Sequence, residues 1–265
     1  MMQDLSRRLA FQKLVHGVTF LSASQTCFAD LSSPLSAISD NEAYWEMVRQ
    51  QFPFREVKVP MNAANLCPSP RQVAEKVVEL TQDIDEDCSF NNRAKFKSTL
   101  EHSRYQVANQ LGVTGDEIAL VRNTSEANNI INNGFPLKPG DEIVLWDQNH
   151  PTNNVAWDIR SSRFNSRVKR VKTPTEPTRL DQLITPFMEA IGTNTRVLAL
   201  THVSNISGLR LPIDKLCDIA HQHNIHVHVD GAQTWGAFNL NLRKLKCDSY
   251  AASSHKWLCG PKAEV

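Results

Sequence analysis

The chain has 265 residues, of which 41% are hydrophobic and 22% charged, a balance typical of a globular protein that buries one large core. Its 29 lysines and arginines nearly cancel its 28 aspartates and glutamates, and the net charge of +1 argues against nucleic acid as a partner. No apolar run approaches the roughly 20 residues that a membrane-spanning helix needs, which argues against a membrane partner.

Residues 1–29 support two interpretations. Arg7 and Arg8 precede a modest apolar stretch over 14–23 and then small residues that suit a cleavage site, so the segment resembles a twin-arginine export signal. Apolar residues between 5 and 18 also keep partial helical spacing, which indicates an amphipathic first helix instead. The first interpretation, which we favour, predicts a periplasmic protein, and the second predicts a cytoplasmic one.

Residues 30–60 are predicted to form an N-terminal arm and residues 61–265 one large domain. The spacing of apolar residues predicts three helices early in the chain, over 41–52, 68–80 and 93–112. The third ends at Gly112, because glycine suits the left-handed conformation of a helix C-cap.

Short runs rich in β-branched and apolar residues follow, and they predict six strands, over 117–123, 142–148, 166–174, 195–204, 225–231 and 247–253. Helical patterns fill most of the intervals between them. This alternation predicts an α/β fold with a mainly parallel sheet that is covered by helices on both faces. Ligands collect at the carboxyl ends of such strands, and polar residues follow five of the six, at 123–125, 149–150, 204–205, 230 and 253–256.

Lys256 in SSHKWLCGPK (253–262) and Asp230 in HVDGAQTWG (228–236) carry the strongest chemical signal. A lysine can bind an aldehyde cofactor as a Schiff base when its site lowers the amine pKa from about 10.4. A carboxylate can keep a pyridinium nitrogen protonated, so that the ring withdraws electrons from an adjacent carbanion. Lysine is most often an exposed loop residue, but the pair together predicts pyridoxal 5′-phosphate as the cofactor.

A phosphate site is predicted where Thr124 and Ser125 open a helix, because hydroxyls and free backbone N–H groups at a helix N-terminus bind phosphate. The same two residues would also serve as ordinary helix caps, and both roles can hold together. Ser253 and His255, just before the lysine, are further candidates for phosphate or ring contacts.

Three other strand-end residues are candidates for contacts with a flat ring. His150 could stack on its face, although a histidine before proline is more often a loop residue; Gln233 and Asn205 could bond its phenolic oxygen. His226 and His228 alternate with Asp230 on one strand face, which raises metal binding as a competing interpretation. No carboxylate or cysteine cluster completes a ligand shell there, and we expect both histidines to pack within the strand with satisfied hydrogen bonds.

The cysteines lie at 27, 67, 88, 217, 247 and 259 and contain no CxxC pair, so neither a disulfide framework nor a zinc site is predicted. Cys259 lies close to Lys256 and could be a nucleophile. The usual behaviour of a free cysteine favours a small apolar filler instead.

Five motifs, in this order and spacing, resemble the class V aminotransferase family of fold-type I pyridoxal-phosphate enzymes: VRNTSEANN, DQNHPTNNVAW, THVSNISGLRLPI, HVHVDGAQTWG and CDSYAASSHKWLCGPK. The resemblance covers about residues 60–265. It implies Lys256 as the Schiff-base lysine, Asp230 at the ring nitrogen and His150 on the ring face. It also implies Gln233 at the phenolic oxygen, Asn205 near ring and substrate, and a phosphate site from Thr124, Ser125, Ser253 and His255. HPTNNVAW and NAANLCPSP are closer to isopenicillin-N-epimerase-like members than to cysteine desulfurases.

Family members continue past the lysine with an antiparallel strand and a small C-terminal domain, which this sequence lacks. The missing strand would lie between 117–123 and 247–253, and two unpaired edges make a stable monomer of this length doubtful. We therefore expect a truncated large domain that would form a homodimer in its full-length form.

The predicted function is a pyridoxal-phosphate-dependent transformation of an amino acid, a small-molecule substrate, by transamination or epimerisation. Three alternatives stay open: a truncated remnant that at most binds the cofactor, a cysteine-desulfurase-like enzyme, and a metal-binding module built on HVHVD.

Overall fold

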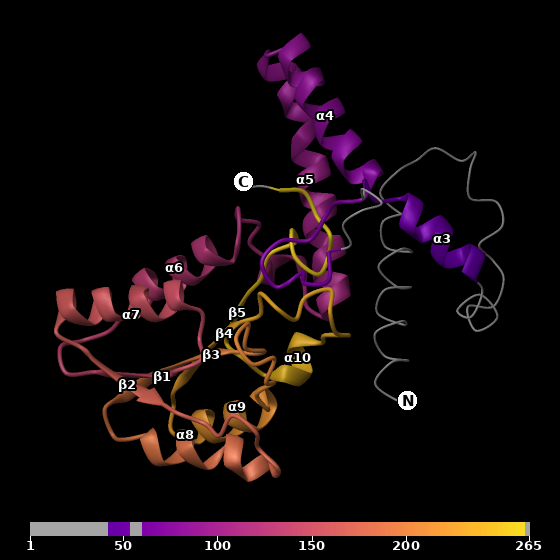
Figure 1. Ribbon diagram of the computed structural model, residues 1–265. Coiled ribbons are helices and arrows are strands. Elements are labelled where there is room, and N and C mark those ends of the chain that lie inside the picture. The colour runs from indigo at the N-terminus through magenta and orange to yellow at the C-terminus, as the bar shows by residue number, and fades with distance from the viewer. Residues whose placement is uncertain (1–41, 54–59, 263–265) are drawn as a thin grey trace.

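The computed structural model describes residues 42–53 and 60–262 (Figure 1). The predicted export signal at 1–29 and most of the predicted arm at 30–60 lie outside these residues. In the described part of the chain, no helix combines the length and the apolar character needed to cross a membrane.

Helices and strands alternate along most of the chain. The first helices are α3 (Glu42–Gln50), α4 (Arg71–Glu86) and α5 (Phe90–Leu111), followed by the short 3-10 helix η1 (Gly115–Glu117). The remaining elements are α6 (Thr124–Gly134), β1 (Glu142–Trp146), α7 (Pro151–Phe164), β2 (Arg167–Val171), η2 (Leu180–Leu183), α8 (Thr185–Ala190), β3 (Thr195–Thr201), α9 (Ile213–Gln222), β4 (His226–Asp230), α10 (Leu242–Leu245) and β5 (Ser249–Ala251). Gly112 follows α5 with a φ of 72°, as predicted for its C-cap.

The five strands form one sheet in the order β2-β1-β3-β4-β5, and every neighbouring pair is parallel. In Figure 1, α6 and α7 lie along one face of this sheet, and α8 and α9 lie along the other. The predicted α/β architecture is confirmed, because helices that cross over between parallel strands must pack on its faces.

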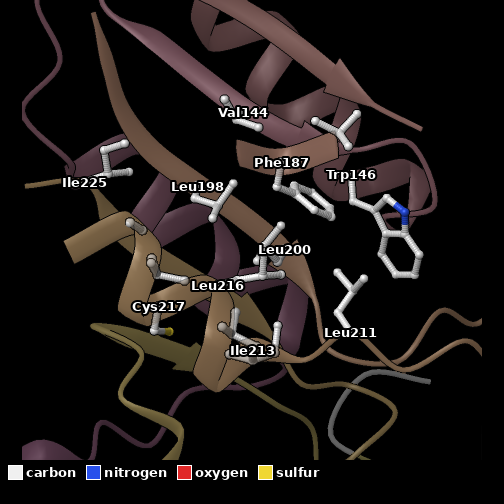
Figure 2. Packing of buried hydrophobic residues seen from close by; sticks show 14 of the residues in the cluster. Val144, Trp146, Phe187, Leu198, Leu200, Leu211, Ile213, Leu216, Cys217 and Ile225 are labelled. Atoms are coloured by element: carbon white, nitrogen blue, oxygen red, sulfur yellow. The ribbon is translucent and has the colours of Figure 1, made fainter. Parts of the chain in front are cut away.

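The face that carries α8 and α9 is apolar. Side chains of β1 and β3 that point to this face include Val144, Trp146, Leu198 and Leu200, all fully buried. They meet Phe187 of α8 and the apolar side of α9, and Figure 2 shows this packing. Burial of these large side chains holds the sheet to its helices.

The face under α6 and α7 is mixed. Ile143 and Leu145 of β1 pack with Trp157 of α7 on this side, together with Val197 and Ala199 of β3. On β4, however, the residues in register with Val197, Ala199 and Thr201 are His226, His228 and Asp230. Since parallel neighbours in register point the same way, β4 presents a polar row toward α6.

The predicted strand over 117–123 is wrong for the chain as described. Residues 115–117 form the 3-10 helix, and the extended stretch that follows pairs with no strand among the described residues. Leu120 and Val121 there are 42% and 36% exposed, and β5 pairs only with β4. The backbone is extended at Ile118, but a strand also requires a neighbour that completes its hydrogen bonds.

Candidate functional site

Asp230, the last residue of β4, is the buried acid of the candidate site and is 2% exposed. Its Oδ1 accepts a hydrogen bond from the Ala232 N–H at 3.0 Å, and its Oδ2 accepts one from Asn128 Nδ2 at 2.9 Å. Burial raises the pKa of this carboxyl, and the two hydrogen bonds and the charges of Lys256 and His150 oppose that rise. Both partners of Asp230 are neutral donors, so the site would gain from a cation at this carboxylate.

Lys256 lies in the loop after β5 and is partly buried. Burial lowers the pKa of its amine, and the charge of Asp230 acts in the opposite direction. The loop is closed by two backbone hydrogen bonds, from Cys259 N to Lys256 O at 3.0 Å and from Gly260 N to Ser254 O at 2.7 Å. A lowered pKa increases the neutral fraction of the amine, which is the form that attacks an aldehyde.

The N-terminus of α6 meets the lysine loop through two hydroxyls. Thr124 N donates to Ser253 Oγ at 2.8 Å, and the two side-chain oxygens are 2.6 Å apart. The N-cap of α6 is Asn123, whose Oδ1 accepts a hydrogen bond from Glu126 N at 2.8 Å. The helix is therefore capped by the residue before Thr124, and not by Thr124 or Ser125 as the sequence suggested. Thr124 and Ser253 are buried together, whereas Ser125 is exposed.

His150 caps α7, where its Nδ1 lies 2.7 Å from Thr152 Oγ1. Its neighbour Asn149 is buried and joins β1 to β3. Asn149 Oδ1 accepts from Thr201 N at 2.8 Å, and its Nδ2 donates to Ala199 O at 2.9 Å. These two bonds of Asn149 hold the turn at the end of β1, and His150 is the next residue. The charge of His150 acts to lower the pKa of Asp230.

Gln233 connects the lysine loop to the segment before α4. Its Nε2 donates to Ala64 O at 2.8 Å, and its Oε1 accepts from Trp257 Nε1 at 2.8 Å. His255 contributes its backbone oxygen to the same junction, accepting from Cys67 N at 3.1 Å. Asn205 lies in an exposed turn after β3, and among the described residues its side chain makes no hydrogen bond to these groups.

Sequence reasoning missed Asn128, a buried side chain of α6 whose Oδ1 lies 2.9 Å from His228 Nε2. His226 Nε2 and His228 Nδ1 both contact Ser249 Oγ, at 3.0 and 2.8 Å, which confirms the expectation of hydrogen-bonded strand histidines. Within the described residues, no cluster of three or more histidine, cysteine or acidic side chains could hold a metal ion. Asn128 carries no motif of its own, and only its position on α6 facing β4 reveals it.

Cys259 is buried, as expected of an apolar filler, but its Sγ lies 3.4 Å from Cys67 Sγ. The pair is separated by 192 positions in sequence, so no spacing pattern could have indicated it.

Comparisons with known proteins indicate the family of this chain. The model of the family described as aminotransferase class-V matches residues 67–263. Isopenicillin N epimerase from Amycolatopsis lactamdurans is 30% identical over 220 residues, which cover 82% of this chain and 55% of that protein. Cysteine desulfurase from Escherichia coli (strain K12 / DH10B) is 34% identical over 152 residues, 56% of this chain and 36% of that one. The chain thus spans about half the length of the epimerase, and its match to the desulfurase covers 36% of that protein.

Two solved structures share the fold. The cystine C-S lyase C-DES, in complex with its product cysteine persulfide, superposes with a TM-score of 0.73 at 24% identity, over 80% of this chain and 57% of that one. A cysteine desulfurase from Escherichia coli gives a TM-score of 0.67 at 29% identity, over 82% of this chain and 56% of that one.

Proposed function

The chain belongs to the class V aminotransferase family, whose enzymes use pyridoxal phosphate, and we propose that it holds this cofactor through Lys256 and transforms an amino acid. The reaction that we propose is epimerisation or amino-group transfer. The observation that carries the proposal is a buried carboxylate, Asp230, whose hydrogen-bond donors among the described residues are neutral. It interacts electrostatically with Lys256, whose amine pKa is lowered by burial.

The donor set of the site fits the cofactor at both ends. A pyridinium N–H would donate a further hydrogen bond to Asp230 and place a positive charge next to its carboxylate. Both would offset the desolvation that raises the pKa of this carboxyl. At the other end, Thr124 and Ser253 offer hydroxyls at the N-terminus of α6. The positive end of the helix dipole favours a phosphate dianion there.

When bound, the cofactor supplies an electron-withdrawing ring that stabilises negative charge at the substrate α-carbon. Asp230 would hold the proton on the ring nitrogen and so maintain that withdrawal. Lys256, once exchanged for the substrate amine, would take a proton from the α-carbon or return one to it. His150 would cover one face of the ring, and Gln233 would approach its phenolic oxygen.

The extent of the similarity supports an epimerase-like or transferase-like reaction ahead of desulfuration, because the epimerase match covers 82% of the chain and the desulfurase match 56%. Desulfuration of cysteine is nevertheless a second candidate, because the desulfurase match has the higher identity, 34% against 30%. A homodimer is part of the proposal for the full-length protein, and sedimentation of that protein would test it.

The covalent link is tested by incubating the protein with pyridoxal phosphate, reducing it with borohydride and mapping the added mass to a peptide. We expect a visible absorbance band and a label on Lys256, both lost in Lys256→Ala. Lys262→Ala is the matched control, because Lys262 is a second partly buried lysine of the same loop and should leave the label unchanged. A label elsewhere, or an undiminished label in Lys256→Ala, would overturn the assignment.

The reaction class is tested by following exchange of the α-hydrogen of amino acids in deuterated water. Exchange with loss of stereochemistry indicates epimerisation, and formation of an oxo acid indicates transamination. Release of sulfide from cysteine would support the desulfurase alternative. A labelled lysine without any turnover would support the alternative of a remnant that only binds the cofactor.

A further inference from the structure

A continuous row of hydrogen bonds leads from the amino end of β4 to the buried acid. It begins at His226, passes through Ser249 Oγ and the two nitrogens of His228, and reaches Asn128. Asn128 then donates to Asp230 Oδ2 at 2.9 Å. The row joins β4, β5 and α6, and its inner members Asn128, His228 and Asp230 are all less than 5% exposed.

With Asp230 ionised, as the proposed function requires, this row has a single direction. A carboxylate oxygen only accepts, so Asn128 must present its amide N–H to Asp230 and its carbonyl oxygen to His228. His228 Nε2 must then carry the proton, which leaves Nδ1 free to accept from the Ser249 hydroxyl. Burial lowers the pKa of His228 to about 3 and keeps its ring neutral, as this arrangement requires.

We infer that Asn128 is a positioning residue, which holds the Asp230 carboxylate ionised and oriented toward the cofactor ring, and that His228 holds Asn128 in that orientation. The inference rests on the proposed function, since it concerns how Asp230 serves the cofactor. Without Asn128, one carboxylate oxygen would be buried with no donor, and the neutral acid would become the favoured form.

Other titratable groups also face Asp230 and must be considered in any pH dependence. These are Lys256 from the loop after β5 and His150 at the N-cap of α7. Tyr250 of β5, whose hydroxyl bonds Thr234, lies in register with Val229 and interacts with Asp230 only electrostatically. None of them bonds the carboxylate directly in the described residues, so the hydrogen bond from Asn128 is the contact whose removal is the cleanest test.

The test compares cofactor binding in Asn128→Leu with binding in Asn129→Leu. Leucine has the same branching at Cγ as asparagine but is bulkier and makes no hydrogen bonds. Asn129 is an exposed neighbour whose side chain, among the described residues, bonds Ser125 O of the same helix. We expect the dissociation constant of pyridoxal phosphate to rise by about 10- to 100-fold in Asn128→Leu, as for loss of a hydrogen bond to a charged group. In Asn129→Leu it should stay at the wild-type value.

The pH profile supplies a readout that a merely structural role would not move. Protonation of Asp230 weakens its attraction for the ring nitrogen, so cofactor affinity should fall on acidification. In Asn128→Leu the midpoint of that fall should lie about one to two pH units higher than in the wild type. The bound cofactor's absorbance, recorded across the same pH range, reports the same change without any turnover.

A second pair of variants keeps the inference falsifiable if Asn128→Leu folds poorly. His228→Gln retains an amide N–H that can reach Asn128 Oδ1 and should stay near the wild-type midpoint, whereas His228→Leu should shift it upward. Equal midpoints in all four variants would overturn the inference. Failure of the wild type itself to label at Lys256 would instead contradict the proposed function.

Discussion

Acidification should destabilise this protein through two buried histidines, His202 and His228, which are 1% and 0% exposed. Burial lowers the pKa of each to about 3, and the nearby Arg210 charge contributes at His202. In the unfolded chain each imidazole titrates near 6.5. The folded pKa is depressed, so each histidine's contribution is fully present above pH 6.5 and is lost as the pH falls toward 3.

The magnitude follows from the difference between the two states at a chosen pH. At pH 5 the unfolded imidazole is almost fully protonated and the folded one is not, which costs about 2 kcal/mol of unfolding free energy for each histidine. That value depends little on the folded pKa, provided this pKa lies well below 5. Two histidines together therefore remove a large part of the stability of an ordinary domain, which is roughly 5–15 kcal/mol.

Urea unfolding at pH 8 and pH 5 measures the effect. Wild-type protein should lose stability between the two pH values, and His228→Gln should lose about 2 kcal/mol less, because glutamine does not titrate. The control is His102→Gln, which replaces an exposed histidine on α5 and should behave as the wild type. If His228→Gln and the wild type lost equal stability on acidification, the buried neutral state of His228 would be refuted.

Two further predictions concern the lysine loop. Gly236→Ala should reduce labelling of the lysine and cost about 1–3 kcal/mol of stability more than Gly140→Ala, because a Cβ at Gly236 would lie 2.5 Å from Leu258 N, while Gly140 has the same φ of 88° and open space. Equal losses of stability in thermal melts of the two variants would contradict the close approach of Gly236 to Leu258. The second prediction concerns Cys67 and Cys259, whose sulfurs are 3.4 Å apart: mild oxidation with diamide, which takes up the two thiol hydrogens, should form a disulfide between them. Peptide mapping should find that link and leave the exposed Cys88 unpaired; cross-links to Cys88 alone would show that the loop lies elsewhere.

Apolar periodicity and strand-end logic were sufficient to predict the sheet and the neighbourhood of Lys256 and Asp230. Residues 142–146 and 197–201 are buried on both faces of the sheet, and such runs are recognisable from composition alone. The stretch 117–123 has a similar composition, but a strand also depends on a partner elsewhere in the chain. Local sequence does not contain that information, and the prediction failed there.

The contacts that complete the site depend on long-range pairing. Asn128 lies 102 positions from Asp230, and it contacts the acid only because α6 packs over β4. An asparagine in a helix pattern is usually a solvated residue, so neither its type nor its spacing distinguishes it from Asn129. The capping residue was also misplaced by one position, because asparagine, serine and threonine cap helices about equally well.

The alternation of β4 explains why stability and site chemistry should respond separately to substitution. Val227 and Val229 point into the apolar cluster beside α9, while His228 and Asp230 point to α6. Val229→Ala should therefore lower unfolding free energy by roughly 1–3 kcal/mol at every pH without moving the midpoint of cofactor binding. His228→Leu should change both the acid sensitivity and that midpoint, whereas His228→Gln should change the acid sensitivity and leave the midpoint near its wild-type value. A shift of the midpoint in Val229→Ala would mean that strand position, rather than the hydrogen-bonded row, controls the ionisation of Asp230.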